Sequence, residues 1–256
     1  MRDSLQVHIV GAGPGDVELI TVKGKRLLET ADIIIYAGSL VNPKLLQYAK
    51  QDAKIYDSAS MTLDEVLQVI EAGVQTGKDV VRLHTGDPSI YGAIQEQMDA
   101  LQKKGIAFEV VPGVSSFLAT AAALKQEYTL PGISQTVIIT RQGGRTAVPP
   151  KEKLQALAAH GATMCIFLSI AMLNDVVQEL IAGGYAEDTP IAIVQKASWP
   201  EQKIVRSTLA HIVQDIEGKS IDRTAMIVVS RCLGADYELS RLYAPTFSHM
   251  FREGKA

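Results

Sequence analysis

The chain has 256 residues, of which 47% are hydrophobic and 21% are charged, and its formal net charge is −3. These values are ordinary for a globular protein, and they exclude a chain-wide basic field of the kind that attracts nucleic acid or an anionic membrane. Cys165 and Cys232 follow apolar runs without CxxC spacing, which favours buried thiols over a disulfide or a zinc site.

Short apolar runs alternate with helix-length amphipathic segments, which is the pattern of an α/β fold with mostly parallel strands. No run is long enough for a signal peptide or a membrane span, so we expect a cytoplasmic protein. A capping box is expected at Thr62 and Glu65. The elements expected in the first half are strands 6–10, 32–36, 54–56, 79–84 and 107–111 and helices 22–31, 43–50, 63–76 and 90–104.

The composition changes after residue 114, where an expected helix of small residues precedes the helix-breaking pair Pro131-Gly132. We therefore expect domains at 1–114 and 115–235 and a tail at 236–256. The short link "KASWPEQ" predicts a hairpin between two of the later strands and so a mixed sheet. The elements expected in this half are helices 115–124, 151–160, 172–182 and 209–216 and strands 135–140, 163–168, 190–195, 203–207 and 225–230.

The glycine-rich turn in "VHIVGAGPGD" (residues 7–16) follows the first expected strand. A dinucleotide site needs a third glycine where Asp16 stands, and an acid at the end of the second strand, where Ala37 stands. Both requirements fail, which disfavours a nicotinamide or flavin site. A tight turn without a ligand remains open on this motif alone.

Several segments in this order resemble the tetrapyrrole (corrin/porphyrin) methylase family: "GAGPGDVELITVKGKRLLETADIIIYAGSLV", "HTGDPSIYGA", "VPGVSS", "FLS" and "AMIVVSR". That family transfers methyl groups from S-adenosylmethionine to ring carbons of cobalamin and sirohaem precursors. The resemblance covers nearly the whole chain. It implies two α/β domains with mixed, mostly parallel sheets, an active-site cleft between the domains, and a homodimer.

Four segments are similar to the subgroup that methylates carbon 11 of precorrin-4 or cobalt-precorrin-4: "YAGSLV", "HTGDPSIYGAIQEQM", "TRQGGRTAVP" and "KASWPEQKIVRSTL". Members acting on uroporphyrinogen carry an acid where Ala37 stands and a lysine that "YDSASMT" lacks, so that substrate is disfavoured. A sibling enzyme acting at another ring carbon stays open, as do a nicotinamide-binding oxidoreductase and a non-catalytic binding module. The motifs do not decide whether the substrate already carries cobalt.

The resemblance implies a set of positions that contact S-adenosylmethionine. The ligand has no phosphate, so it needs close backbone approach and an apolar wall rather than an anion cradle. The implied positions are Pro14, Thr85, Gly86, Asp87, Ile90, Ser115, Ser116, Leu168, Ala197, Ala225 and Met226. Within this set, Leu168 and Met226 also fit strand core.

An anionic tetrapyrrole with many carboxylates needs cationic donors in its site. The candidates for substrate binding are Arg141, Arg145, Lys196, Arg206 and Tyr91, although each cation also fits a solvated surface charge. Methyl transfer to carbon needs positioning and no side-chain nucleophile, so no catalytic residue is assigned. The five histidines show no metal-ligand spacing, and we expect no metal, nucleic acid or membrane partner.

Overall fold

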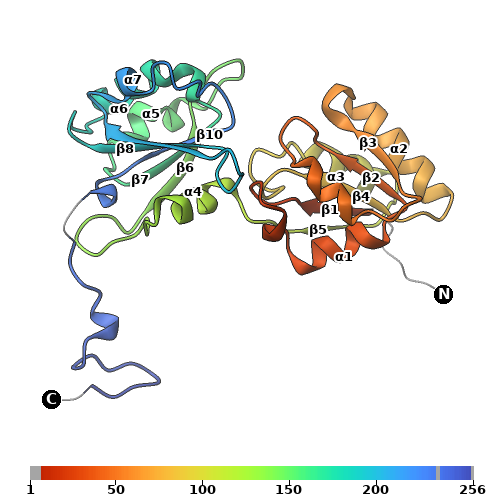
Figure 1. Cartoon of the computed structure of the whole chain (residues 1–256), viewed down its shortest axis with the longest axis horizontal. Coiled ribbons are helices and arrows are strands. Elements are labelled where there is room, and N and C mark those ends of the chain that lie inside the picture. Colours follow the sequence, from red (N-terminus) through yellow and green to blue (C-terminus); the bar gives the residue numbers. More distant parts are fainter. Residues whose placement is uncertain (1–6, 235–236, 255–256) are drawn as a thin grey trace. The chain divides into compact units, whose positions relative to one another are not determined.

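The structure is a computed structural model and describes residues 7–234 and 237–254. Contacts among these residues divide the chain into two compact units, each built on its own sheet (Figure 1). Unit 1 runs to Ala119 and also includes Lys196–Glu201, whereas unit 2 comprises the remaining residues. The domain borders expected at residues 114 and 235 stay predictions.

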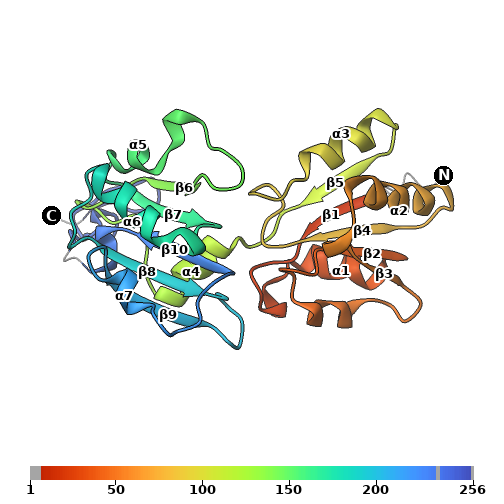
Figure 2. The same ribbon diagram turned by 90° about the horizontal axis from the view of Figure 1, so that it is seen from above.

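The sheet of unit 1 is parallel throughout, with strand order β3-β2-β4-β1-β5 (Figure 2). Its strands are β1 (Val7–Gly11), β2 (Ile33–Tyr36), β3 (Lys54–Asp57), β4 (Val80–His84) and β5 (Phe108–Val111). Its helices are α1 (Val22–Thr30), α2 (Leu63–Gln75) and α3 (Gln95–Lys103). Because all five strands run the same way, their carboxyl ends share one edge of the sheet.

Helices cover both faces of this sheet, as parallel strands require. Leu28 of α1 packs with Val10, Ile34 and Leu83 on one face. The opposite face packs against α2 and α3 through a second apolar cluster, with members Val7, Ile33, Ile35, Val66, Leu67, Ile70, Val80 and Leu101. Along β4, Val80 belongs to this second cluster, whereas Val81 and Leu83 belong to the first. Because side chains alternate between the faces of a strand, the even-numbered residues of β4 lie on the α2 and α3 face.

The sheet of unit 2 is mixed, with order β6-β7-β10-β8-β9. Its strands are β6 (Val137–Arg141), β7 (Thr163–Phe167), β8 (Pro190–Gln195), β9 (Lys203–Thr208) and β10 (Ala225–Val229). Strands β6 and β7 are parallel, while β10 pairs antiparallel with β7 and β8. The hairpin predicted across "KASWPEQ" is confirmed by the antiparallel β8–β9 pair.

The remaining helices are α4 (Ser116–Leu124), α5 (Leu154–Ala158), α6 (Leu173–Ala182) and α7 (Ile212–Asp215). Side chains of α5, α6 and α7 pack on one face of the second sheet around Ile166, Ile193 and Ile227. Both free cysteines are buried, as expected.

The helix expected over residues 90–104 was wrong in its first turn, because α3 begins only at Gln95. Tyr91 and Ala93 adopt left-handed backbone angles, with φ of 54° and 48°. At Gly92 an added Cβ would lie 2.1 Å from the Pro88 carbonyl oxygen, so the chain is folded tightly on itself there. Such a segment cannot continue a right-handed helix.

Three other expected helices are shorter than predicted. Residues Pro43–Tyr48 form a 3-10 helix, and a 3-10 turn at Pro150–Glu152 precedes the short α5. Helix α7 starts at Ile212 because the preceding residues complete β9 and a turn. The capping box at Thr62 and Glu65 is confirmed. Gln6, which opened the first predicted strand, lies outside the described residues.

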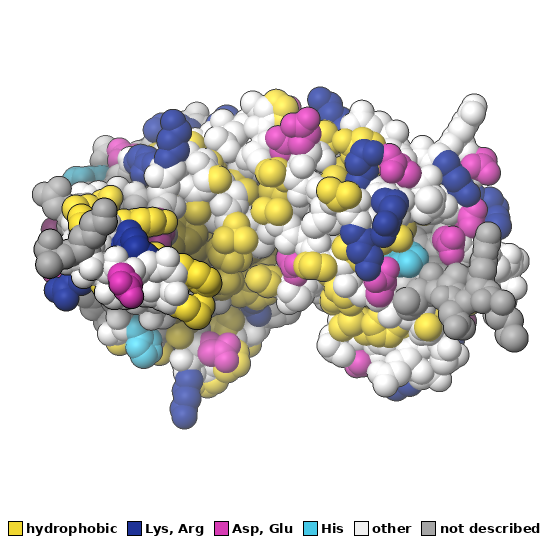
Figure 3. Space-filling model, turned by 90° about the horizontal axis from the view of Figure 1, so that it is seen from below, with side chains coloured by type: hydrophobic (Ala, Val, Ile, Leu, Met, Phe, Trp, Pro, Cys, Tyr) yellow, Lys and Arg dark blue, Asp and Glu magenta, His cyan; other side chains and the backbone are white. Residues whose placement is uncertain are grey.

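Surface charge is mixed rather than concentrated. Figure 3 shows Lys and Arg side chains interspersed with Asp and Glu on the face that it presents. This agrees with the small net charge of −3. Among the described helices, none has both the length and the apolar character needed to cross a membrane.

Candidate active site

Three glycines bring the carboxyl ends of β1, β4 and β5 into backbone contact. A Cβ added to Gly11 would lie 2.6 Å from the Gly113 Cα, and one on Gly113 would lie 2.2 Å from the Gly86 carbonyl oxygen. Gly13 and Gly86 also exchange two backbone hydrogen bonds, of 3.2 and 2.9 Å. We call Gly11, Gly86 and Gly113 the glycine junction. Close packing of the backbone requires glycine at positions 11 and 113, while Gly86 has a left-handed φ of 56°. The sequence analysis expected these glycines to allow a ligand to approach, and that expectation stays a prediction.

Asp87 holds the loop after β4 against the loop after β5. One of its carboxylate oxygens accepts a 2.9 Å hydrogen bond from the Gly113 N–H, and the other accepts from the Ser89 N–H at 2.9 Å. Burial raises the pKa of the Asp87 carboxyl, but hydrogen bonds from Ser89 and Gly113 outweigh it and lower the pKa overall. Asp87 is therefore an anion near neutral pH, and both oxygens help to shape the loop.

The segment Lys196–Glu201 packs onto the glycine turn after β1. The Trp199 indole N–H donates to the Pro14 carbonyl at 2.9 Å, and the Asp16 N–H donates to the Ser198 hydroxyl at 3.0 Å. A Cβ on Gly15 would lie 1.9 Å from the Trp199 Nε1, so only glycine leaves room for the indole ring. Sequence reasoning did not find this contact, because it joins residues far apart in the chain.

The cofactor positions implied within unit 1 gather at this edge of the sheet. Gly86 has a φ of 56°, and its added Cβ would meet the Ser115 Cα at 3.7 Å and the Ser116 nitrogen at 3.8 Å. Ala197 is buried in the segment that contacts Pro14. The fold brings these positions together, and their contact with the cofactor stays a prediction. The positions at or next to the strand ends of this edge are Pro14, Thr85, Gly86, Asp87, Ile90, Ser115, Ser116 and Ala197.

Within unit 2, Leu168 and Ala225 share one end of the mixed sheet. Strand β10 pairs with β7 with Ile227 opposite Ile166, so Ala225 at the start of β10 lies beside the end of β7. Leu168 is 65% exposed and has a φ of 56°, an unusual conformation for leucine. Met226 is only 4% exposed, so it lies largely in the core, which the sequence had left as an option.

The arginines predicted to bind substrate have different environments. Arg141 donates hydrogen bonds to the carbonyl oxygens of Thr146 and Ala147, both at 3.0 Å, and so fixes the shape of its own loop. Arg145 is exposed in that loop. Arg206 pairs with Ala192 within the sheet and donates to the Leu124 carbonyl at 2.6 Å, away from the sheet end occupied by Leu168. Only Arg145 is left with its guanidinium unengaged by the described residues.

The other two predicted substrate residues lie in unit 1. The Lys196 ammonium stands 5.3 Å from the centre of the Trp199 ring and 3.9 Å from a carboxylate oxygen of Glu201. Tyr91 follows β4 with a left-handed backbone angle, and its side chain is 46% exposed. Their roles toward the substrate stay predictions.

Two buried polar side chains lie on β4, His84 at its end and Arg82, which the sequence analysis did not single out. Burial lowers the pKa of His84 to about 4, with a smaller effect from the Arg82 charge. Its Nδ1 has no hydrogen-bond partner among the described residues. Burial also lowers the pKa of Arg82 to about 10, which leaves it charged at neutral pH. In the sequence, this feature was visible only as two polar residues, Arg82 and His84, within an apolar strand.

We expect the free energy of unfolding to fall as the pH drops from 6.5 to about 4. Unfolded His84 takes up a proton near pH 6.5, but the folded state resists it until about pH 4. The unfolded state therefore binds more protons in this window, which costs the fold about 3 kcal/mol. Urea unfolding at pH 7 and pH 4.5 should show a smaller pH effect in His84→Gln than in the unchanged chain. Equal pH effects in both proteins would contradict this.

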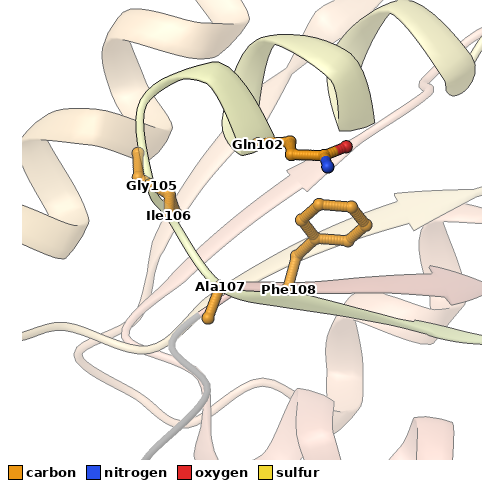
Figure 4. Close-up of a pocket in the computed structure, with 5 residues that line it drawn as sticks. All are labelled: Gln102, Gly105, Ile106, Ala107 and Phe108. Atoms are coloured by element: carbon orange, nitrogen blue, oxygen red, sulfur yellow. The ribbon is translucent and has the colours of Figure 1, made fainter.

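The two cavities found in unit 1 lie away from the glycine junction. One of about 340 Å³ is at the α3–β5 turn, where Gln102 faces Phe108 (Figure 4). Its lining is completed by Gly105, Ile106 and Ala107. The other, of about 690 Å³, lies between α2 and β3 and includes Tyr56, Met61 and Val69. The candidate site is thus defined by strand ends and loop geometry.

A parallel sheet with glycine-lined loops at its carboxyl edge is typical of α/β proteins that bind ligands beyond the strand ends. The family model for Tetrapyrrole (Corrin/Porphyrin) Methylases matches residues 6–213. The chain belongs to the tetrapyrrole methylase family, which confirms the resemblance drawn from its motifs.

Three relatives illustrate the similarity. A cobalt-precorrin-4 C(11)-methyltransferase of Methanocaldococcus jannaschii is 56% identical over 254 residues, covering 99% of this chain and 98% of the relative. A solved cobalt-precorrin-4 methyltransferase matches with a TM-score of 0.88 and 45% identity, over 90% of this chain and 97% of its own. A Thermus thermophilus uroporphyrin-III C-methyltransferase complexed with S-adenosylhomocysteine matches with a TM-score of 0.74 and 28% identity, over 90% and 93%.

Proposed function

We propose that this protein transfers a methyl group from S-adenosylmethionine to carbon 11 of cobalt-precorrin-4 in cobalamin biosynthesis. The observation that carries the proposal is the 56% identity to a cobalt-precorrin-4 C(11)-methyltransferase over 99% of this chain. That relative's substrate also favours the cobalt-bearing ring over precorrin-4, a choice the motifs had left open. Residue Ala37 in place of an acid disfavours both a uroporphyrinogen substrate and a nicotinamide cofactor.

The carboxyl edge of unit 1 fits S-adenosylmethionine. Gly86 leaves an open cradle bounded by the backbone of Ser115 and Ser116, where a Cβ would fill the space. The Ser116 N–H begins α4 and suits a carboxylate, while the Asp87 anion suits a cationic ligand. The cofactor supplies a methyl group already activated by a positively charged sulfur. The residues of this edge would bind and orient it, as catalysis by positioning requires.

The second group of predicted contacts, Leu168, Ala225 and Met226, is assigned to the same cofactor by family resemblance. Exposed Leu168 offers an apolar surface for an adenine ring, and its left-handed backbone is typical of residues near ligands. Because Met226 is buried, we expect it to contribute through its backbone.

Calorimetric titration with S-adenosylhomocysteine tests the cofactor assignment. We expect saturable binding with one site per chain. Absence of saturable binding by a folded sample would refute the proposed function. An NADH titration followed by fluorescence serves as the control, and it should show no binding.

Arg145→Ala is expected to raise the KM for the tetrapyrrole by about 10-fold, because an exposed guanidinium can pair with a substrate carboxylate. The Kd of S-adenosylhomocysteine and the thermal stability should stay unchanged. Lys151→Ala, another exposed cation in unit 2, is the charge-matched control. Equal weakening of both ligands by Arg145→Ala would show that the arginine has another role.

We also propose that the protein is a cytoplasmic homodimer, as the family resemblance implies. Two buried cysteines that form no disulfide with each other fit a reducing compartment. Light scattering on the purified protein should give twice the mass of one chain, and a monomer at micromolar concentration would contradict the dimer.

A further inference from the structure

A buried arginine and a buried glutamine lie on the α2 and α3 face of the first sheet. Arg82 of β4 and Gln97 of α3 are each only 6% exposed. The Arg82 Nε donates to the Gln97 side-chain oxygen at 3.2 Å, and its Nη1 donates to the Ile35 carbonyl at 3.2 Å. None of the ion pairs in the described part of the chain includes Arg82.

This charged side chain is costly in an otherwise apolar layer. Its neighbours on the same face include Ile35 and Leu101, which are almost fully buried. Removing a guanidinium from water carries a penalty that an apolar side chain of similar volume avoids. Stability alone therefore does not account for an arginine at this position.

Gln97 connects Arg82 to residues 91–94, the segment after β4 in which Tyr91 and Ala93 have left-handed backbone angles. Its side-chain N–H donates to the Ala93 carbonyl at 3.2 Å, while its oxygen accepts from Arg82. Ala93 and Tyr91 have φ of 48° and 54°, which costs roughly 1–2 kcal/mol for each residue. Such conformations persist only where the surroundings fix them, and they cluster at ligand-binding segments.

We propose that Arg82 and Gln97 are positioning residues that hold residues 91–94 so that Tyr91 contacts the tetrapyrrole. This inference rests on the proposed function. Tyr91 is 46% exposed and follows the Asp87 loop at the carboxyl edge of the sheet. A phenol ring offers an apolar face to a macrocycle and a polar tip to its carboxylates. The buried guanidinium keeps the Gln97 amide turned with its N–H toward Ala93.

Gln97→Glu separates positioning from folding. The glutamate keeps an acceptor for Arg82 and supplies a counter-charge, but it removes the donor to Ala93. We expect the KM for cobalt-precorrin-4 to rise about 10-fold, while the Kd of S-adenosylhomocysteine stays within twofold. Gln95→Glu is the matched control, because Gln95 is exposed on the same helix and its side chain donates to Asp99. The control should change neither quantity.

A double-mutant cycle shows whether Gln97 acts through Tyr91. In a Tyr91→Ala background, Gln97→Glu should raise the KM no further. A KM unchanged in Gln97→Glu, additive effects in the cycle, or an equal loss of S-adenosylhomocysteine affinity would each overturn the proposal.

Chymotrypsin cleavage after Tyr91, identified by mass spectrometry, tests the holding role without any substrate. We expect cleavage at least 10-fold faster in Gln97→Glu than in Gln95→Glu or the unchanged chain. Equal cleavage rates would overturn the holding role. If the unchanged chain showed no turnover, the proposed function and the role of Tyr91 would fail together, and the cleavage rates would still decide whether the pair holds the segment.

Discussion

Gly113→Ala is expected to disrupt the glycine junction and with it the candidate site. The added methyl group would lie 2.2 Å from the Gly86 carbonyl oxygen and 2.8 Å from the Gly11 Cα. All of these are backbone atoms of strand ends, so no side chain can rotate away. We expect a loss of about 3 kcal/mol in the free energy of unfolding and no measurable binding of S-adenosylhomocysteine.

Gly105→Ala is the control for this substitution. Gly105 has no atom within 4 Å of its added Cβ, and only its φ of 66° resists alanine. We expect a cost of about 1 kcal/mol with ligand binding retained. Urea unfolding and calorimetry measure both variants. A Gly113→Ala protein as stable as Gly105→Ala, with normal ligand affinity, would contradict the packing assigned to the glycine junction.

Trp199→Ala is expected to weaken the binding of S-adenosylhomocysteine by 10-fold or more. The indole ring occupies the space left by Gly15, and its N–H donates to the Pro14 carbonyl at 2.9 Å. Removing it leaves the glycine turn and the segment that holds Ala197 joined by the Asp16–Ser198 hydrogen bond. Both parts include positions that we propose contact the cofactor. The lost aromatic packing should also lower the Tm by several degrees.

Trp199→Phe separates the contribution of aromatic packing to this affinity from that of the indole hydrogen bond. Phenylalanine keeps an aromatic ring against Gly15 but leaves the Pro14 carbonyl without its donor. We expect an intermediate affinity, because one neutral hydrogen bond contributes about 1 kcal/mol. An affinity unchanged in Trp199→Ala would show that this contact does not support the cofactor site.

Most strands could be predicted from the sequence because their apolar runs are short and bounded by turn residues. The hairpin at residues 190–207 was also predictable, because a link as short as "KASWPEQ" cannot hold a helical crossover. The start of α3 could not be predicted. Residues 90–94 are of types that a helix accepts, but Tyr91 and Ala93 adopt left-handed backbone angles. The segment is held locally, by the close approach of Gly92 to Pro88 and by the hydrogen bond from Gln97 to Ala93.

The parts of the candidate site that a short local motif determines could be predicted from the sequence. Gly11 and Gly86 indicated positions without room for a side chain, and at Gly11 the structure shows the backbone of Gly113 and Gly86 in that space. The contact between Trp199 and Pro14 could not be inferred, since 185 residues separate the partners. The same holds for Arg82, whose partners come from β2 and α3. The loop-shaping role of Arg141 is a further case, because a sequence does not show where a guanidinium points.

Transfer of an isotopically labelled methyl group from S-adenosylmethionine to cobalt-precorrin-4 tests the proposed function most directly. The product is isolated, its mass is measured, and the labelled carbon is located by NMR. We expect one added methyl group, attached at carbon 11. A label at another ring carbon, or no transfer to the ring by protein that binds S-adenosylhomocysteine, would contradict it.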